Sequence, residues 1–207
     1  MGKEIFKIVS SRKQRFIWFE GEINGQSART FIKQLTKLNN DGSEPIFFYI
    51  SGQGGFLNSF LNITIAIQNS TSKIFCVAHG LAQSAPFLLT QAVPTGFRFA
   101  VAGTKFQFHR TVDTLIKSIR AGAEFFQEDY LSVFKTLVRL DGLVLAMFFL
   151  KCKPECRDQI TELQQREKVI SVNKAIKLGI IDNYFDKKCF QKDQRIARAL
   201  LKRRKSS

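Results

Sequence analysis

Residues 46–55 read IFFYISGQGG, an apolar run that ends in a glycine-rich corner. The run has no polar alternation apart from the hydroxyl of Tyr49, which favours a strand in a sheet that is covered on both faces. Gly54 and Gly55 follow this strand, where glycines let the backbone approach a ligand and present N–H groups to it. A plain tight turn explains the glycines equally well. A phosphate loop does not, because the Walker pattern is missing.

Strands and helices alternate around this segment. We expect further strands at residues 15–19, 74–78, 97–101 and 106–109, and helices after Asn24, over residues 57–68 and from Ser84 onward. Such an alternation predicts an α/β fold with right-handed crossovers.

The second half of the chain is more helical. Residues 121–151 predict a long helix that is apolar almost all the way round near residues 143–150, so we expect a neighbouring subunit to bury it. Ser171 is expected to cap another helix that ends at Gly179, before a short strand at residues 180–181.

The 207 residues suffice for one domain of ordinary size. We divide the chain into a short N-terminal segment (1–14), one domain (15–186) and a basic C-terminal tail (187–207). The net charge is +15, and residues 187–205 hold nine Lys and Arg against one acid, Asp193. We interpret this tail as solvated and expect no nucleic-acid partner, because no aromatic-interleaved motif accompanies the charge.

Neither a membrane partner nor a cofactor is expected. The longest apolar stretch is far shorter than the ~20 residues of a membrane span, and the initial MGKEIF lacks the apolar core of a signal peptide. We therefore expect a cytoplasmic protein, or one in an organelle stroma or matrix. Four cysteines and two histidines form no metal-ligand pattern, so reduced thiols and no metal are expected.

Ser84 is the candidate nucleophile. It follows a strand and a turn of small residues and opens a helix, which exposes its hydroxyl, and Ala85 supplies a backbone N–H directly after it. A serine nucleophile needs a neighbouring base, and His109 at a strand end can provide it. His79 lies only five residues before Ser84 and is interpreted as part of the strand-to-turn transition. The structural alternatives are an N-cap serine and a strand-end histidine.

The order and spacing of these elements resemble the Clp protease proteolytic-subunit (ClpP) family. Four segments carry the resemblance, and they read SGQGG at 51–55, GLAQSAP at 80–86, FQFHR at 106–110 and REKVISVNKAIKLGIID at 166–182. The resemblance implies a ClpP/crotonase-like α/β fold, a ββα spiral with a projecting handle helix, in which residues 15–186 form the peptidase domain.

The resemblance also implies a function. It implies a serine endopeptidase of the Clp type that hydrolyses unfolded proteins or peptides inside an oligomeric chamber. Ser84 is then the nucleophile and His109 the general base, while the N–H groups of Gly55 and Ala85 hold the oxyanion. The third triad position, Asp in the family, falls on Glu167, with Asp158 as a rival. Self-association into heptameric or double heptameric rings and an AAA+ unfoldase partner are implied as well.

Three alternatives stay open at this point. The first is a catalytically weak or inactive ClpP-like subunit of a mixed ring, motivated by Glu167 and by Gln53 and Pro86, where the family has Pro and Gly. The second is an acyl-CoA enzyme of the crotonase fold. The third is a nucleic-acid-binding protein, motivated by charge alone. The short segment before residue 15 also implies that the axial hairpin and first helix of the family are largely missing.

Overall fold

The computed structural model describes residues 6–111, 113, 116 and 127–203. The described part holds a sheet in the order β1-β2-β3-β4-β5-β8, while β6 pairs with β4 and β7 pairs with β6. The strands are β1 (Phe6–Ser11), β2 (Phe16–Gly21), β3 (Ile46–Gly52), β4 (Ile74–Gln83), β5 (Arg98–Ala100), β6 (Lys105–Gln107), β7 (Ile170–Ser171) and β8 (Asn183–Tyr184). The helices are α1 (Gly25–Asn40), α2 (Leu57–Gln68), α3 (Ala85–Leu89), α5 (Gln127–Phe149), α6 (Arg157–Gln165), α7 (Val172–Lys177) and α8 (Lys187–Arg203), with a 3-10 turn at Pro154–Cys156.

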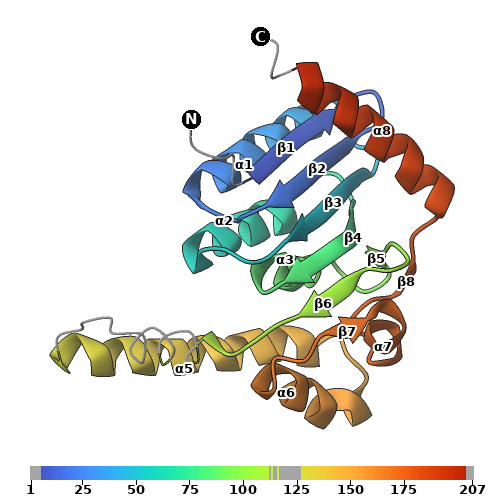
Figure 1. The fold of residues 1–207 in the computed structure, drawn as a ribbon. Helices are drawn as coiled ribbons and strands as arrows, with labels where there is room; N and C mark the ends of the chain where they lie inside the picture. The colour runs from blue at the N-terminus through green and yellow to red at the C-terminus, as the bar shows by residue number, and fades with distance from the viewer. Residues whose placement is uncertain (1–5, 112, 114–115, 117–126, 204–207) are drawn as a thin grey trace.

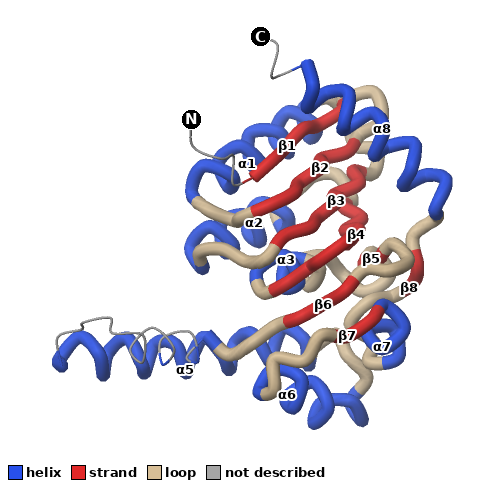
Figure 2. Tube along the Cα trace, in the orientation of Figure 1, coloured by secondary structure: helices blue, strands red, loops and turns tan. Residues whose placement is uncertain are grey.

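Helices cover both faces of the sheet, as the apolar strands predict. Strands β2, β3 and β4 run parallel, and Figure 1 shows α1, α2 and α3 behind them and α8 in front. Side chains therefore alternate between two cores: Phe19 and Phe48 pack on the side of α1, whereas Trp18 and Tyr49 pack on the side of α8. Figure 2 shows the same strands stepping down the molecule, with β6 continuing the stack below β4.

Most of the expected elements are confirmed. Asn24 caps α1 by accepting hydrogen bonds from the N–H groups of Gln26 and Ser27, 3.0 and 2.9 Å long. The predicted helix over residues 57–68 is α2. Ser171 caps α7, and Gly179, at a φ of +74°, ends the helix in the left-handed conformation that favours glycine.

The N-terminal boundary differs from the expectation. Residues 1–14 were expected to lie outside the domain, but β1 is a strand of the sheet and pairs with β2 in antiparallel register from Phe6↔Gly21 to Ser11↔Phe16. Lys7 and Ser10 interrupt the apolar residues of this segment, so the sequence pattern does not indicate a strand here. The pairing with β2 and the burial of Ile8 and Val9 define β1 as part of the domain.

Two smaller expectations are wrong. Residues 80–82 do not form a turn, because β4 continues to Gln83 after a shift in register at its pairing with β3. The short strand predicted at residues 180–181 lies instead at β8, where Asn183 and Tyr184 pair with Phe99 and Ala100 of β5. Ile180 and Ile181 are buried in the core, so their apolar pattern reflects packing and not a strand.

The C-terminal tail is also not a solvated appendage. Residues 187–203 form the amphipathic helix α8, which lies diagonally across the front of the sheet in Figure 1. Phe190 and Ala197 on its inner face are 9% and 1% exposed. The side chain of Asp193 accepts a hydrogen bond of 2.7 Å from the hydroxyl of Tyr49 in β3.

Helix α5 projects away from the body of the protein (Figure 1), as a handle helix would. Residues 121–126 of the predicted helix lie outside the described residues. Near its carboxyl end the helix is anchored by Phe148, which is fully buried and packs against Phe87 and Phe108 with ring centroids 5.2 and 4.8 Å apart. None of the helices in the described part of the chain is long and apolar enough to span a membrane.

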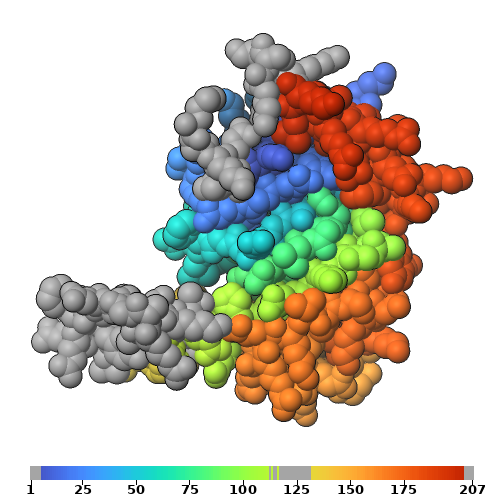
Figure 3. Space-filling view, viewed as in Figure 1, coloured from blue at the N-terminus to red at the C-terminus, as the bar shows by residue number. Residues whose placement is uncertain are grey.

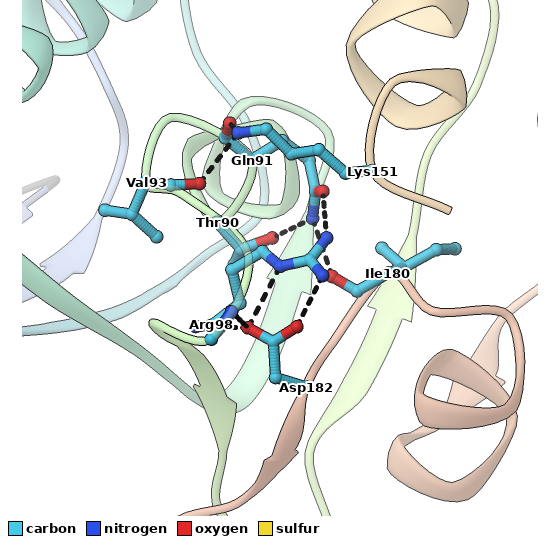
Figure 4. Close-up of polar contacts among 8 residues, drawn as sticks. Thr90, Gln91, Val93, Arg98, Lys151, Ile180 and Asp182 are labelled. Atoms are coloured by element: carbon cyan, nitrogen blue, oxygen red, sulfur yellow. Dashed lines mark hydrogen bonds and ion pairs between the residues drawn. The ribbon is translucent and has the colours of Figure 1, made fainter. Parts of the chain in front are cut away.

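A buried arginine joins the sheet to the C-terminal elements (Figure 4). Arg98 of β5 is 1% exposed and forms an ion pair of 2.5 Å with Asp182. The guanidinium also donates to the side chain of Gln91 at 3.1 Å, and Gln91 in turn donates to the carbonyl of Ile180 at 3.0 Å. Lys151 donates to the carbonyls of Gln91 and Val93. These contacts fix the position of the chain that follows α7.

Candidate active site

Ser84 lies at the junction of β4 and α3. Its backbone adopts φ +55° and ψ −123°, a conformation that side-chain-bearing residues rarely adopt. The N–H of Ser84 donates to the carbonyl of Gln107 in β6 at 2.7 Å, and its carbonyl accepts from Leu88 in α3 at 3.0 Å. Hydrogen bonds to β6 and to α3 therefore hold this junction in a sharp, strained corner. Strained backbone of this kind is found preferentially at functional sites.

The side chain of Ser84 is half-buried, and no hydrogen bond between described residues involves its hydroxyl. It faces the glycine corner after β3: a Cβ added at Gly54 would lie 3.4 Å from Cβ and 3.7 Å from Oγ of Ser84. A side chain at position 54 would therefore touch Ser84 at ordinary van der Waals distance, and the φ of +146° is what favours glycine there.

His109 follows β6, the strand next to β4. The parallel pairing of β4 and β6 places Gln83 opposite Gln107, so Ser84 and His109 leave the sheet at neighbouring strand ends. The Nδ1 atom of His109 lies 3.1 Å from the carbonyl oxygen of Arg110, and no hydrogen bond joins His109 to Ser84 in the described structure. Ser84 and His109 thus lie at one edge of the sheet, but they lack the hydrogen bond through which a general base takes the proton of the serine.

His79 has a structural position, but it lies within β4 and not at a strand-to-turn transition, because the strand continues to Gln83. It is buried within β4, with its ring centroid 4.6 Å from that of Trp18 and 5.5 Å from that of Phe190. Burial lowers the pKa of His79 to about 4, and its Nε2 atom has no hydrogen-bond partner among the described residues. Through these two rings it packs against the core beneath α8.

Glu167 lies in the segment between α6 and β7. The side-chain amide of Gln107 donates to the carbonyl of Glu167 at 2.7 Å, and β7 pairs antiparallel with β6 through Phe106↔Ile170. Both contacts bring Glu167 to the strand that ends at His109. The rival Asp158 is exposed in the first turn of α6.

The two expected oxyanion donors differ in position. Gly55 forms a bridge with Ile23, and a Cβ at Gly55 would lie only 2.1 Å from the carbonyl oxygen of Ile23, so glycine is required there for close backbone approach. Gly54, which was not among the two expected oxyanion donors, lies beside Ser84. Among the described residues, no hydrogen bond uses the N–H of Gly54, Gly55 or Ala85. All three N–H groups are therefore candidate donors.

Asp141 is a second residue that sequence analysis missed. This carboxylate on α5 is 7% exposed and accepts a hydrogen bond of 2.5 Å from the N–H of Thr111, two residues after His109. It therefore anchors the start of the segment that follows the candidate base. A single acid inside a helical apolar pattern gives no such indication, because its partner is a backbone group thirty residues away in the chain.

Comparisons with known proteins agree with this architecture. The family model described as Clp protease matches residues 2–188. The ATP-dependent Clp protease proteolytic subunit of Carsonella ruddii is 25% identical over 177 residues, which cover 85% of this chain and 86% of the relative. The protein of the same name from Dehalococcoides mccartyi is 25% identical over 188 residues, 90% of each chain.

Among solved structures, a variant of ClpP1 from Listeria monocytogenes superimposes with a TM-score of 0.67 at 22% identity. The match covers 84% of this chain and 93% of that structure. This likeness confirms the ClpP/crotonase-like fold with its projecting handle helix. The family model begins at residue 2 and so includes β1, in line with the corrected N-terminal boundary. Taken with the strand-end positions of Ser84 and His109, these matches establish that the chain belongs to the Clp protease family.

Proposed function

We propose that the protein is a Clp-type serine endopeptidase with Ser84 as its nucleophile. The observation that carries this proposal is the strained backbone of Ser84, whose hydroxyl makes no hydrogen bond among the described residues and lies beside a glycine corner. Strain of this kind costs about 1–3 kcal/mol and persists where the surrounding structure enforces it. A serine that merely capped α3 would accept a hydrogen bond through its side chain, and Ser84 does not.

The positions of Ser84 and His109 at neighbouring strand ends support a mechanism of acyl transfer. Ser84 Oγ attacks the peptide carbonyl while His109 takes its proton, and His109 gives that proton to the leaving amine. Water, deprotonated by His109, then hydrolyses the acyl-enzyme, and the proton goes back to Ser84 Oγ. The developing oxyanion is held by the N–H of Ala85 together with that of Gly55 or Gly54. Glu167 orients the imidazole of His109 and stabilises its cationic form, a role supported by the contact of its backbone with Gln107.

The substrates and partners follow from the family. We propose unfolded polypeptides as substrates, ring-shaped self-association, and an ATP-driven unfoldase as partner, because the relatives are named as proteolytic subunits of ATP-dependent proteases. Self-association is further supported by exposed apolar side chains on α5, among them Val138 and Leu143, which are 48% and 64% exposed. Such side chains favour burial by a neighbouring subunit.

A fluorophosphonate probe tests the nucleophile. Wild-type protein should be labelled, and Ser84→Ala should lose the label while keeping the wild-type circular dichroism spectrum. Ser43→Ala is the matched control, because Ser43 is exposed in the loop before β3, and its labelling should be unchanged. Labelling of the Ser84→Ala variant at the wild-type level would refute the assignment.

A catalytically inactive subunit of a mixed ring is the second candidate. It is favoured by one observation: the Nδ1 of His109 lies against the carbonyl of Arg110, and no hydrogen bond joins His109 to Ser84. An inactive subunit would resist the probe alone and in assembled rings. An active subunit whose site closes on assembly would be labelled in the rings.

A further inference from the structure

The outer face of α8 carries a cluster of cations. We call it the α8 basic face, and its six residues, all exposed, are Lys187, Lys188, Lys192, Arg195, Arg198 and Lys202. No salt bridge between described residues involves any of the six. The cluster extends along a helix of 17 residues, which is roughly 25 Å long at about 1.5 Å per residue.

Packing against the sheet keeps these cations facing outward. The apolar face of α8 is covered by the sheet through Phe190 and Ala197. The one acid within the helix, Asp193, is half-buried and accepts a hydrogen bond from Tyr49. Two carboxylates lie near the cluster: Asp193 interacts with Lys192, and the exposed Asp186, directly before the helix, interacts with Lys188. The six cations outnumber these two acids, so the face keeps a net positive charge. Figure 3 shows the helix (red) as a ridge on the surface of the molecule.

We propose that the α8 basic face binds the phosphate backbone of a nucleic acid, independently of the peptidase site. Phosphate binding requires aligned cations and little else, because most of its free energy comes from the release of counterions. Lys188, Lys192 and Arg195 stand at positions i, i+4 and i+7 and so follow one line along the helix. This reverses the expectation from the sequence, which treated the same residues as a solvated tail.

The composition of this face argues against a protein partner and against an anionic membrane. A protein partner would need apolar or aromatic anchors at the centre of the interface, and no large apolar side chain is exposed on the described residues of α8. An anionic membrane would be bound more firmly through inserted apolar side chains, but Ile196, Leu200 and Leu201 pack against the core beneath the helix. The regularly spaced phosphates of a nucleic acid fit a row of cations that has no exposed apolar side chains.

Two triple variants separate the α8 basic face from net charge. Lys188→Gln/Lys192→Gln/Arg195→Gln removes two lysines and one arginine from α8. The matched control, Arg29→Gln/Lys33→Gln/Lys37→Gln, removes the same kinds of charge from exposed positions of α1. Fluorescence anisotropy of the full-length protein with a short labelled duplex DNA is then measured between about 50 and 200 mM salt.

The proposal predicts that the α8 variant binds the duplex at least about tenfold more weakly. Its plot of log affinity against log salt should be shallower by about 0.9 for each of three lost phosphate contacts. The α1 variant should retain the wild-type slope.

Equal losses in both variants would mean that net charge alone attracts the duplex, and absence of salt-dependent binding would also overturn the proposal. So would equal competition by poly-glutamate or phosphatidylserine vesicles. Labelling of Ser84 is measured in parallel, so failure of the peptidase proposal remains a separate result.

Discussion

The hydroxyl of Tyr49, in the middle of the sheet, donates a hydrogen bond of 2.7 Å to Oδ2 of Asp193 on α8. The two residues are 144 positions apart in the chain. Tyr49 is fully buried and Asp193 is half-buried. Burial raises the pKa of Asp193, and the bond from Tyr49 opposes that rise. This bond, with the packing of Phe190, attaches the C-terminal helix to the domain.

Removal of the Tyr49 hydroxyl should loosen this attachment. Tyr49→Phe leaves the carboxylate of Asp193 half-buried without its donor, so we expect a loss of about 1–3 kcal/mol in the free energy of unfolding. The double variant Tyr49→Phe/Asp193→Ala should recover part of that loss, because no unpaired carboxylate remains. Tyr184→Phe makes the same change at an exposed hydroxyl that contacts Asn173 and should cost less than about 0.5 kcal/mol. Urea denaturation provides the measurement. Equal losses at Tyr49 and Tyr184 would contradict the role of the Tyr49–Asp193 bond.

His79 should make the stability of the protein depend on pH. Its pKa is about 4 when buried beneath α8, compared with 6.5 in its ordinary state. Between these values the unfolded chain binds a proton that the folded protein does not. Stability is therefore fully present above pH 6.5 and falls as the pH drops toward 4, by up to ~3 kcal/mol.

The variant His79→Phe isolates this effect. It keeps an aromatic ring against both Trp18 and Phe190 and removes the group that titrates, so the difference in stability between variant and wild type should grow as the pH falls from 6.5 to 4. Asp193 and other acids titrate in both proteins and cancel in the difference. A difference that is constant with pH would show that His79 does not titrate with a lowered pKa.

Glu167 should be required for turnover if it completes the triad. Glu167→Gln removes the charge that orients and stabilises the imidazole of His109, a loss that can reach roughly 10⁴-fold in turnover. Asp158→Asn, on the exposed first turn of α6, should leave peptide hydrolysis nearly unchanged. Steady-state hydrolysis of a fluorogenic peptide by the assembled protein measures both variants. Comparable turnover in Glu167→Gln and wild type would remove Glu167 from the triad.

The exposed apolar residues of α5 should control self-association. Leu143→Glu places a charge on a side chain that is 64% exposed, so the protomer should fold while its assembly is weakened, because an unpaired charge is costly to bury in an interface. Thr136→Glu adds the same charge at an exposed polar position of the same helix and should leave assembly closer to wild type. Sedimentation velocity distinguishes the two. Wild-type assembly of Leu143→Glu would exclude this part of α5 from the interface.

Phe148 is not a suitable position for that experiment. The sequence places it in the same apolar stretch and suggests that a neighbouring subunit buries it. In the structure it is fully buried within its own protomer, against Phe87 and Phe108. A charge at position 148 would therefore unfold the protein, and loss of assembly would carry no information about the interface.

Local patterns in the sequence determined much of the fold. The apolar strand before the Gly54–Gly55 corner, the Asn24 cap and the helix over residues 57–68 each depend on contacts within a few residues, so a short window of sequence contains their causes. The order of the motifs was sufficient to recognise the family and to select Ser84 and His109 as candidates. Their roles stay predictions until the variants are measured.

Tertiary structure decided what depends on distant partners. β1 is a strand because β2 pairs with it, and α8 is an ordered helix because the sheet covers its apolar face. Likewise, a Cβ at Gly54 would touch Ser84, and one at Gly55 would meet the carbonyl of Ile23, because the bridge between Ile23 and Gly55 fixes the path of that corner. In each case the free energy comes from burial or pairing between segments far apart in the chain, which no local window of sequence contains.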